Sequence, residues 1–289
     1  MLKHMVLIAT LRHLTQKDAP LTVIDTHAGA GLYRLDGDYA GTSGEAQDGI
    51  ARLIGPGKPA PAAGTDTLAP VLQDYLDMVS AFNKPGDLKV YPGSPFICQR
   101  LLRAEARDKL KLFELHPTDS RSLAGNVAQL NVGRQVTVAR EDGFEALKAL
   151  LPPPSRRALV LIDPSYEIKS DYPRVTDTVT DALKRFATGT YVVWYPIIPR
   201  PEAHGLPRKL KTLATRVAKP WLHATLTVKS SKIGVDASGA QVRPGLPASG
   251  MFLINPPYTL KAALQPALSQ LAKLLAQDSH AAFLLESAG

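Results

Sequence analysis

Cysteine is almost absent from this sequence, and long apolar runs are missing altogether. Among 289 residues Cys98 is the single cysteine, which excludes an internal disulfide, and no Cys/His cluster has the spacing of a zinc site. The seven histidines are scattered, so we expect no metal site. No stretch approaches the roughly 18 uninterrupted apolar residues of a membrane span, and the apolar run from Met5 ends at Arg12. We therefore expect a cytoplasmic protein without a membrane anchor.

Acidic residues are fewer than basic ones. The chain has 34 Lys and Arg against 26 Asp and Glu, a formal charge of +8. Lys and Arg that neutralise phosphates gain free energy from counterion release, so this balance favours a polyanionic partner such as nucleic acid. An ordinary basic cytoplasmic protein would have the same charge, and composition alone does not decide between the two.

Apolar runs of strand length alternate with helical patterns along most of the chain. After a helical pattern at 2–14, strands are expected at 21–25, 110–116, 135–142, 158–164 and 190–196, with helices between them at about 118–130, 143–151 and 173–186. This alternation predicts a parallel sheet with right-handed crossovers.

Two segments interrupt the alternation. Residues 41–107 contain three helix-like stretches but no convincing strand, so we interpret them as a helical subdomain inserted into a main domain of residues 1–40 and 108–289. Near the end, the strand-like runs at 223–229 and 250–255 flank a segment rich in Gly, Pro and Ser that reads as a long, mobile hairpin loop. The last of the seven expected strands should then run antiparallel.

Ligands of an open parallel sheet bind at the carboxyl ends of its strands, so residues there are the candidates for a site. Gly29 and Gly31 follow the first strand and allow close approach of the backbone, although the third glycine of a dinucleotide fingerprint is absent. Glu114 follows the second strand, where it could accept hydrogen bonds from a ribose diol, and Asp142-Gly143 follows the third, where it could hold an adenine amine. Singly these residues are typical helix caps and turn formers. At successive strand ends, they favour an adenosine-containing cofactor.

Two tetrapeptides look like the signature of enzymes that methylate the exocyclic amine of a nucleobase. The first, Asp163-Pro164-Ser165-Tyr166, follows the fourth strand. The amine lone pair is delocalised into the ring, so an enzyme must orient it. The Asp163 carboxylate and the Pro164 carbonyl could each accept one N–H, and Tyr166 could stack on the extruded base. The alternative is that Asp163-Pro164 only ends the strand and that Tyr166 belongs to the core.

The second tetrapeptide, Asn255-Pro256-Pro257-Tyr258, matches the signature better but follows the expected antiparallel strand. Its position then falls at the sheet edge away from the cofactor. We therefore interpret it as a strand terminator in which two prolines stop the ladder.

Several strings in this order resemble the RlmJ family, S-adenosylmethionine-dependent enzymes that make N6-methyladenosine at one adenine of 23S ribosomal RNA. These are His4, DTHAGAG at 25–31, YPGSP at 91–95, ELHP at 114–117, Asp142-Gly143 and IDPSYE at 162–167. The resemblance implies a Rossmann-like methyltransferase fold with S-adenosylmethionine as cofactor and 23S ribosomal RNA as partner, and we expect a monomer. It also implies cofactor contacts at His4, His27, Ser94, Glu114, Asp142 and Gly143, with Asp163 as catalytic acceptor.

Ser94-Pro95 fits such a contact as a helix N-cap followed by proline, because a helix N-terminus suits a carboxylate. Lys3, Ser165 and Lys169 are the candidates near the substrate, although any surface lysine is more often a solvated charge. His4 and His27 are supported by the resemblance alone.

The sequence departs from the family at two places. Relatives carry a segment rich in His, Tyr and Asn before the pair matched by Lys3-His4, whereas this sequence starts at Met1-Leu2. Ser165 stands where the family has a second proline, and its N–H is expected to loosen the turn and reduce activity. Both departures leave open an alternative, a catalytically weak nucleic-acid-binding relative with a role in external DNA use. A nicotinamide-dependent oxidoreductase is a third hypothesis, weakened by the absent glycine.

Overall fold

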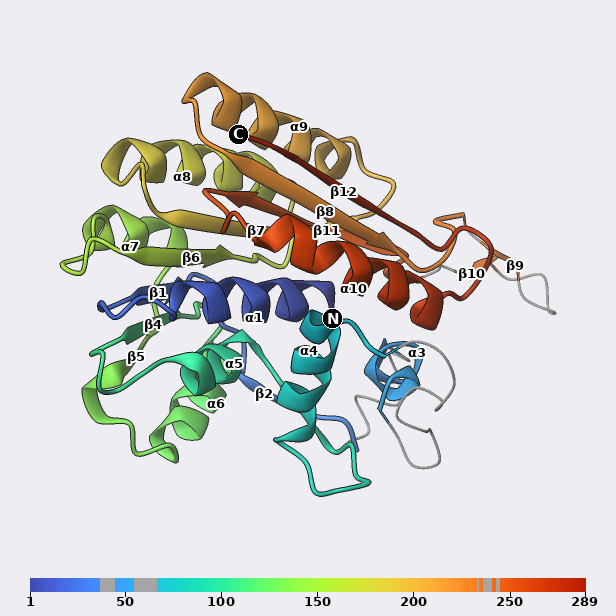
Figure 1. Cartoon of the computed structure of the whole chain (residues 1–289), viewed down its shortest axis with the longest axis horizontal. Coiled ribbons are helices and arrows are strands. Elements are labelled where there is room, and N and C mark those ends of the chain that lie inside the picture. Colours follow the sequence, from blue (N-terminus) through green and yellow to red (C-terminus); the bar gives the residue numbers. More distant parts are fainter. Residues whose placement is uncertain (37–44, 55–66, 233, 236–240, 243–244) are drawn as a thin grey trace.

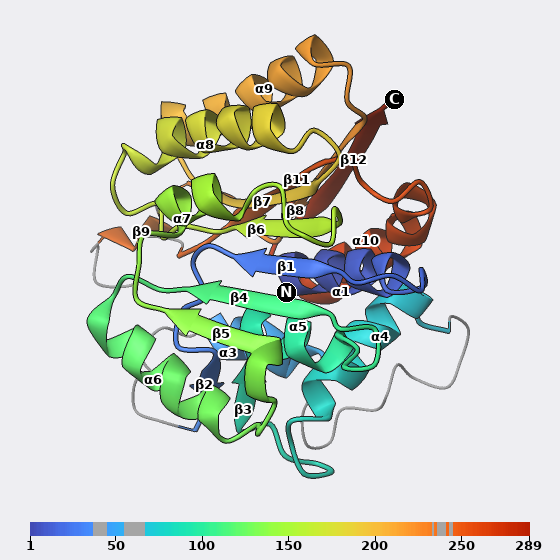
Figure 2. The ribbon, with the colours of Figure 1, turned by 90° about the vertical axis from the view of Figure 1, so that its left-hand side faces the viewer.

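One eight-stranded sheet forms the centre of the computed structural model, which describes residues 1–36, 45–54, 67–232, 234–235, 241–242 and 245–289 (Figures 1 and 2). Its strands, in spatial order, are β12 (Ala282–Ala288), β8 (Trp221–Thr227), β11 (Ala248–Ile254), β7 (Thr190–Ile197), β6 (Ala158–Ile162), β1 (Thr22–Asp25), β4 (Lys109–Phe113) and β5 (Val136–Ala139). The five strands from β7 to β5 are parallel. The mostly parallel sheet expected from the sequence is therefore confirmed.

Helices cover both faces of the sheet (Figure 2). One layer consists of α7 (Gly143–Leu150), α8 (Asp171–Arg185) and α9 (Pro201–Arg216); the other contains α1 (Leu2–Leu14), α4 (Pro70–Ser80), α5 (Ser94–Leu101), α6 (Pro117–Ala128) and α10 (Leu260–Leu275). Successive side chains of a strand point to opposite faces. In β6, Leu159 and Leu161 pack into the α1 layer, whereas Val160 and Ile162 pack into the α8 layer.

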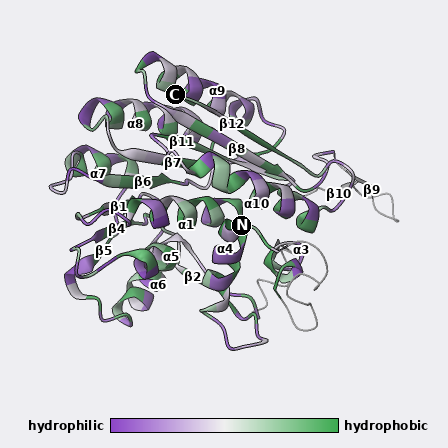
Figure 3. Ribbon diagram, in the orientation of Figure 1, coloured by the Kyte–Doolittle hydropathy of each residue, from purple (hydrophilic) through white to green (hydrophobic). Residues whose placement is uncertain are grey.

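The outer helices are amphipathic, and in Figure 3 they carry both purple hydrophilic and green hydrophobic segments. Helix α8, for example, buries Val175 and Val179 and exposes Asp177 between them. Among the described residues, none of the helices has both the length and the apolar character that crossing a lipid bilayer requires.

Strand β11 runs antiparallel between β7 and β8, with Gly250 opposite Tyr195 on one side and Thr225 on the other. The predicted antiparallel strand is thus confirmed. The expected count of seven strands is wrong, because β12 adds an eighth antiparallel to β8. Within the predicted loop between 231 and 249, β9 (Gly234–Val235) pairs with β10 (Gln241–Val242), and residues 233, 236–240 and 243–244 lie outside the described part.

The predicted insertion, residues 41–107, holds α3 (Glu45–Asp48), a 3₁₀ turn η1 (Ile50–Arg52), α4 and α5. The expectation that it lacks strands is wrong, since β3 (Val90–Pro92) pairs antiparallel with β2 (Leu32–Arg34). Each of these strands has three residues, too few for a periodic pattern. Residues 41–44 and 55–66 of the segment lie outside the described part.

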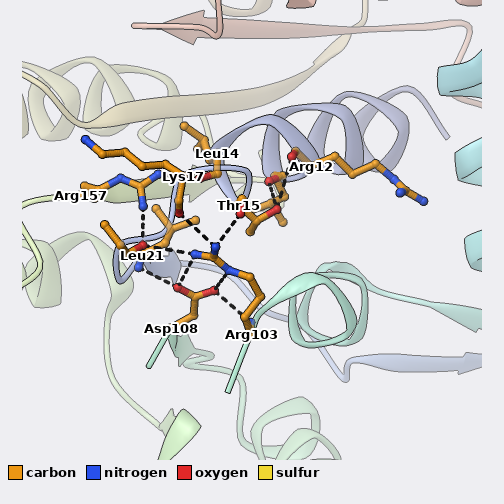
Figure 4. Close-up of polar contacts among 10 residues, drawn as sticks. Arg12, Leu14, Thr15, Lys17, Leu21, Arg103, Asp108 and Arg157 are labelled. Carbon is orange, nitrogen blue, oxygen red and sulfur yellow. Dashed lines mark hydrogen bonds and ion pairs between the residues drawn. The ribbon is translucent and has the colours of Figure 1, made fainter. Parts of the chain in front are cut away.

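A buried polar cluster fixes the connection between α1 and β1 (Figure 4). The guanidinium of Arg103 donates to the carbonyls of Thr15, Lys17 and Ala19 and pairs with Asp108, whose side chain is fully buried. Arg157 donates to the carbonyls of Leu14 and Ala19. Buried carbonyls need such donors. This cluster therefore holds the C-terminal end of α1 at the amino edge of the sheet.

Candidate active site at the carboxyl edge of the sheet

The predicted site residues converge because β6, β1, β4 and β5 are neighbours and parallel (Figure 2). Their carboxyl ends place Asp163, Asp25, Glu114 and Asp142 along one edge of the sheet. Helix α1 runs back against the sheet, so its first turn reaches the same edge. The sequence-based placement of these four carboxylates at successive strand ends therefore agrees with the sheet order.

The centre of this edge is an ion pair between Lys3 and Asp163. The Lys3 ammonium contacts Oδ2 of Asp163, and the two side chains are 23% and 11% exposed. Burial opposes the charged form of Lys3, but its attraction to Asp163, with a smaller one to Asp25, prevails and raises the pKa of the amine. Burial also raises the pKa of the Asp163 carboxyl, while Lys3 acts in the opposite direction. Lys3 is thus a charged group that faces two strand ends.

Asp25 ends β1 and is fully buried. Burial raises its pKa to about 6, although the Ser94 hydroxyl, Lys3 and the His27 amide all lower it. Ser94 itself is 3% exposed. The prediction that Ser94 caps α5 is wrong by one position, because Gly93 is the N-cap and Ser94 is the first helical residue. The Ser94 hydroxyl is therefore directed toward Asp25 rather than back toward its own helix.

The glycine turn after β1 has left-handed backbone at two positions, Gly29 with φ of 62° and Gly31 with φ of 82°. Glu114 supports this turn, because its Oε2 accepts the Gly29 N–H at 2.8 Å and its Oε1 accepts the His116 N–H at 2.8 Å. A Cβ at Gly31 would lie 2.9 Å from the Phe96 ring. The turn therefore requires glycine and packs closely against its neighbours beside a carboxylate.

Asp142 is the N-cap of α7, as its position predicts, and accepts hydrogen bonds from the amides of Phe144 and Glu145. Partial burial would raise the pKa of its carboxyl, but the contact with Arg174 at 2.6 Å outweighs this effect and lowers the pKa. A Cβ on Gly143 would stand 2.0 Å from the carbonyl oxygen of Thr26. Glycine at this position thus allows α7 to begin in contact with the end of β1.

The two predicted histidines have different surroundings at this edge. The His27 ring stands edge-on to Phe144, and burial lowers the pKa of its imidazole to about 4. In α1, His4 is 4% exposed, and its Nδ1 lies 3.0 Å from the Tyr91 hydroxyl. Its Nε2 is buried and has no partner among the described residues. A buried imidazole nitrogen without a partner is costly, and a ligand at this edge would relieve that cost.

The residues of the first tetrapeptide, in the loop after β6, differ in how deeply they are buried. Pro164 is buried and Ser165 is exposed. Tyr166 is 2% exposed, has a left-handed φ of 56°, and donates its hydroxyl to the Trp194 carbonyl at 2.6 Å. In this conformation its ring packs against Tyr172 and is not free to stack on a base. Arg200, the N-cap of α9, donates to the carbonyl of Tyr166 at 3.2 Å and so holds the same loop.

Lys169 lies at the rim of the site. Its ammonium is 3.7 Å from Glu202 at the start of α9, and its side chain is 75% exposed. Of the two lysines predicted near the substrate, Lys3 contacts Asp163 and Lys169 does not.

Asn255 lies at the opposite edge of the sheet. Its amide N–H bonds the Pro220 carbonyl before β8, and its side chain donates to the carbonyls of Ala187 and Gly189 before β7. These groups mark the amino ends of β7 and β8. The interpretation of the second tetrapeptide as a strand terminator away from the glycine turn is therefore confirmed.

Four contact residues at this edge escaped the sequence analysis: Tyr33, Tyr91, Arg174 and Arg200. A Cβ on Gly29 would lie 2.3 Å from the Tyr33 hydroxyl, so this ring lies over the glycine turn. A cavity of about 490 Å³ adjoins the site and is lined in part by Tyr33 and Tyr91, but not by Asp163. No local pattern links these residues to the strand ends, because helices and the β2–β3 pair bring them there.

Comparison with known proteins gives consistent matches over almost the whole chain. The family described as ribosomal RNA large subunit methyltransferase D, RlmJ, matches residues 18–284. The ribosomal RNA large subunit methyltransferase J of Escherichia coli (strain K12) is 38% identical over 267 residues, which are 92% of this chain and 86% of that protein. The protein of the same description from Haemophilus influenzae is 36% identical over 286 residues, 99% of this chain and 92% of its own.

A solved structure has a similar fold. The crystal structure of a protein from Legionella pneumophila str. Philadelphia 1 superposes with a TM-score of 0.82 at 29% identity, covering 99% of this chain and 96% of that one.

Proposed function

The chain belongs to the RlmJ family of ribosomal RNA large subunit methyltransferases, and from this premise we propose that it methylates the N6 amine of an adenine in 23S ribosomal RNA. S-adenosylmethionine is the cofactor and supplies an electrophilic methyl group on its sulfonium sulfur. The contacts at the carboxyl edge of the Rossmann-like sheet support this proposal, and the buried Asp163 carboxylate carries it.

The residues at the edge fit the cofactor. Gly29, Gly31 and Gly143 let the turn and the start of α7 pack closely against their neighbours, and the Glu114 carboxylate beside the turn suits a ribose diol. Asp142 could accept from the adenine amine at the N-terminus of α7. The unpartnered Nε2 of His4 offers a hydrogen bond near the start of α5, where Ser94 lies.

Asp163 stands where a base must meet this cofactor. It follows β6, the strand beside β1. Lys3 occupies its Oδ2, and among the described residues no other side chain bonds its Oδ1. One carboxylate oxygen is therefore free to accept an N–H from the adenine amine while Lys3 keeps the other oxygen in place.

The chemistry needed from the protein is orientation of the amine lone pair. Asp163 accepts one N–H and the Pro164 carbonyl accepts the other, which directs the lone pair out of the base plane. When the methyl group passes to N6, the N–C bond would form as the bond from that carbon to the sulfonium sulfur breaks and leaves a neutral thioether. The amine would then be cationic, and the carboxylate would stabilise this charge in a site of low dielectric. The proton then leaves N6 toward Asp163, the nearest base. Lys3 keeps the carboxylate ionised before the step.

The turn is held by groups other than a second proline. Tyr166 anchors it to β7 through the Trp194 carbonyl, and Arg200 binds the Tyr166 carbonyl. These two contacts support an active enzyme over the alternative of an inactive nucleic-acid-binding relative, because they fix the backbone that carries Pro164 although Ser165 is exposed.

The test is incubation of the protein with methyl-labelled cofactor and unmodified 23S ribosomal RNA, followed by nucleoside analysis. N6-methyladenosine should form with the parent and not with Asp163→Ala, while Asp163→Ala still binds the cofactor in calorimetry. Equal methylation by the parent and by Asp163→Ala would refute the assignment of Asp163. Binding of the RNA without any methylation would favour the alternative.

A further inference from the structure

Much of the positive charge of the chain is concentrated in one segment. Residues 200–219, which include α9, carry six Lys and Arg and a single acidic residue, Glu202, a net charge of +5 out of the +8 of the whole chain. The neighbouring helix α8 balances its basic residues with Asp171, Asp177 and Asp181. The excess charge is therefore a property of α9 and its flanks and not of the whole helical layer.

The charge lies on the outer face of α9. The inner face buries Ala203, Leu206, Leu210, Leu213 and Ala214 against the sheet. Arg208, Lys209 and Arg216 are exposed, and no ion pair is formed by any of them within the described ranges. Thr212 and Thr215, which lie between them in the helix, are exposed and short. The three basic side chains are thus presented along about 12 Å of helix, from Arg208 to Arg216.

The N-terminal end of this face is joined to the catalytic loop. Arg200, just before α9, donates to the carbonyls of Tyr166 and Glu167, and Glu202 in its first turn pairs with Lys169. In Figure 2, α9 lies beside α8 at the end of the molecule away from α6. The N-terminal end of α9 therefore contacts the loop that carries Asp163, and the exposed basic residues begin about 12 Å farther along the helix, at Arg208.

We propose that the outer face of α9 binds the phosphate backbone of the substrate RNA and so docks the strand that carries the target adenine. This inference rests on the proposed function and names the surface that it uses. Unpaired Lys and Arg spaced along one helix suit successive phosphates, and displaced counterions supply the free energy. Contacts of this kind position the RNA without reading its sequence, which leaves recognition to the pocket at Asp163.

The test compares two matched triple variants. Arg208→Glu, Lys209→Glu and Arg216→Glu reverse the charge of the α9 face. Lys84→Glu, Arg121→Glu and Arg134→Glu make the same change in charge and residue type at exposed positions on the other side of the molecule, again without an ion pair in the described part. Binding of a 23S-derived RNA fragment is measured over a range of salt concentrations, with methylation of the fragment and of an adenine-containing trinucleotide.

The α9 triple variant should weaken binding of the fragment by about tenfold or more near physiological salt and reduce the salt slope by about 2, since about three phosphate contacts are lost. Its KM for the fragment should rise while kcat and the rate with the trinucleotide stay near those of the parent. The control triple should change each quantity much less. Equal losses in the two triples, or an equal loss on fragment and trinucleotide, would overturn the proposal.

A measurement on the unchanged protein guards against misfolding of a variant. Amine modification of Lys209 should slow when the RNA fragment is bound, and modification of Lys84 should not. An unprotected Lys209 in the RNA complex would overturn the proposal independently of any substitution. If the parent protein methylates no RNA, the proposed function fails, and the binding and protection data still decide whether α9 is the docking surface.

Discussion

Lys3 and Asp163 lie 160 positions apart, yet the ammonium of the first contacts the carboxylate of the second in a largely buried site. The contact joins the first turn of α1 to the carboxyl end of β6 and makes the N-terminal helix part of the proposed catalytic edge.

Replacing Lys3 with Met should change the pH dependence of methyl transfer. Loss of the opposite charge leaves burial unopposed, so the pKa of the Asp163 carboxyl rises and the carboxylate needed for the reaction forms only at higher pH. The acid limb of kcat against pH should move upward by about 1 to 2 pH units. Lys3→Arg keeps the charge and should preserve the limb. If the acid limb of the kcat profile of Lys3→Met coincides with that of the parent, the ion pair does not set the ionisation of Asp163.

Asp25→Asn should flatten the pH dependence of stability. The pKa of Asp25 in the folded protein is about 6, above the ordinary value of 3.8, so the folded state holds a proton that the unfolded chain releases. This contribution is full below about pH 4 and is lost as the pH rises through 6. Asparagine does not titrate, so the variant should lack this loss. Between pH 4 and pH 7.5 the unfolding free energy of Asp25→Asn should fall by about 1–3 kcal/mol less than that of the parent. Urea unfolding at several pH values measures the two free energies, and the same pH dependence in both proteins would contradict the raised pKa of Asp25.

Tyr166 gives a prediction that separates a core role from base stacking. Tyr166→Phe loses one buried hydrogen bond and should cost about 1 kcal/mol of unfolding free energy, whereas Tyr166→Ala should cost about 3–5 kcal/mol because the ring is buried. Because Tyr166→Phe keeps the ring, its KM for RNA should stay within about threefold of the parent under either role, and the stability of Tyr166→Ala is the measurement that separates them. Tyr166→Ala that unfolds at the same urea concentration as the parent would show that the ring is not core.

Gly143→Ala should damage both the fold and the cofactor site. The added Cβ would stand 2.0 Å from the Thr26 carbonyl oxygen, so the backbone at β1 or α7 must move, at a cost of about 1–3 kcal/mol. Cofactor affinity measured by calorimetry should fall with it. Gly125→Ala is the matched control, because a Cβ there meets no atom within 4 Å in the interior of α6, and alanine should stabilise by about 0.5–1 kcal/mol. Equal effects of the two substitutions would contradict the close approach at Gly143.

Asn255→Ala should destabilise the protein without altering the chemistry. The variant loses bonds to the carbonyls of Ala187 and Gly189 and places alanine at a φ of 54°, a combined cost of about 2–3 kcal/mol. Methyl transfer by the folded variant should equal that of the parent. Asp163→Asn should show the reverse pattern. Loss of cofactor binding in folded Asn255→Ala would place the second tetrapeptide in the site after all.

The sequence predicts the sheet and the order of the site carboxylates because both depend on local patterns. Each parallel strand is a short apolar run, and its last residue marks the edge where ligands bind, so Asp163, Glu114 and Asp142 could be placed together before the structure was known. The antiparallel direction of β11 likewise follows from its hairpin connection, which correctly moves Asn255 to the far edge.

What the sequence could not predict depends on contacts between distant segments. The pair of Lys3 with Asp163 and the stacking of His4 on Tyr91 are set by the packing of α1. The inward direction of Tyr166 follows from a hydrogen bond to β7, which a tetrapeptide alone does not encode. Strand β12 was not predicted because apolar and polar residues do not alternate regularly in AFLLESA, and this segment is a strand because it pairs with β8.

The cluster of Arg103, Asp108 and Arg157 fixes the C-terminal end of α1, so any rigid-body tilt of the helix would displace its N-terminal end. The helix has 13 residues, with the cluster at its C-terminal end and Lys3 in its first turn, about 16 Å from Leu14. A tilt of about 5° about the C-terminal end would move the Lys3 backbone by roughly 1.4 Å, a displacement large enough to lengthen a hydrogen bond beyond its normal range. The alignment of the catalytic edge is therefore determined in part at the opposite end of the molecule.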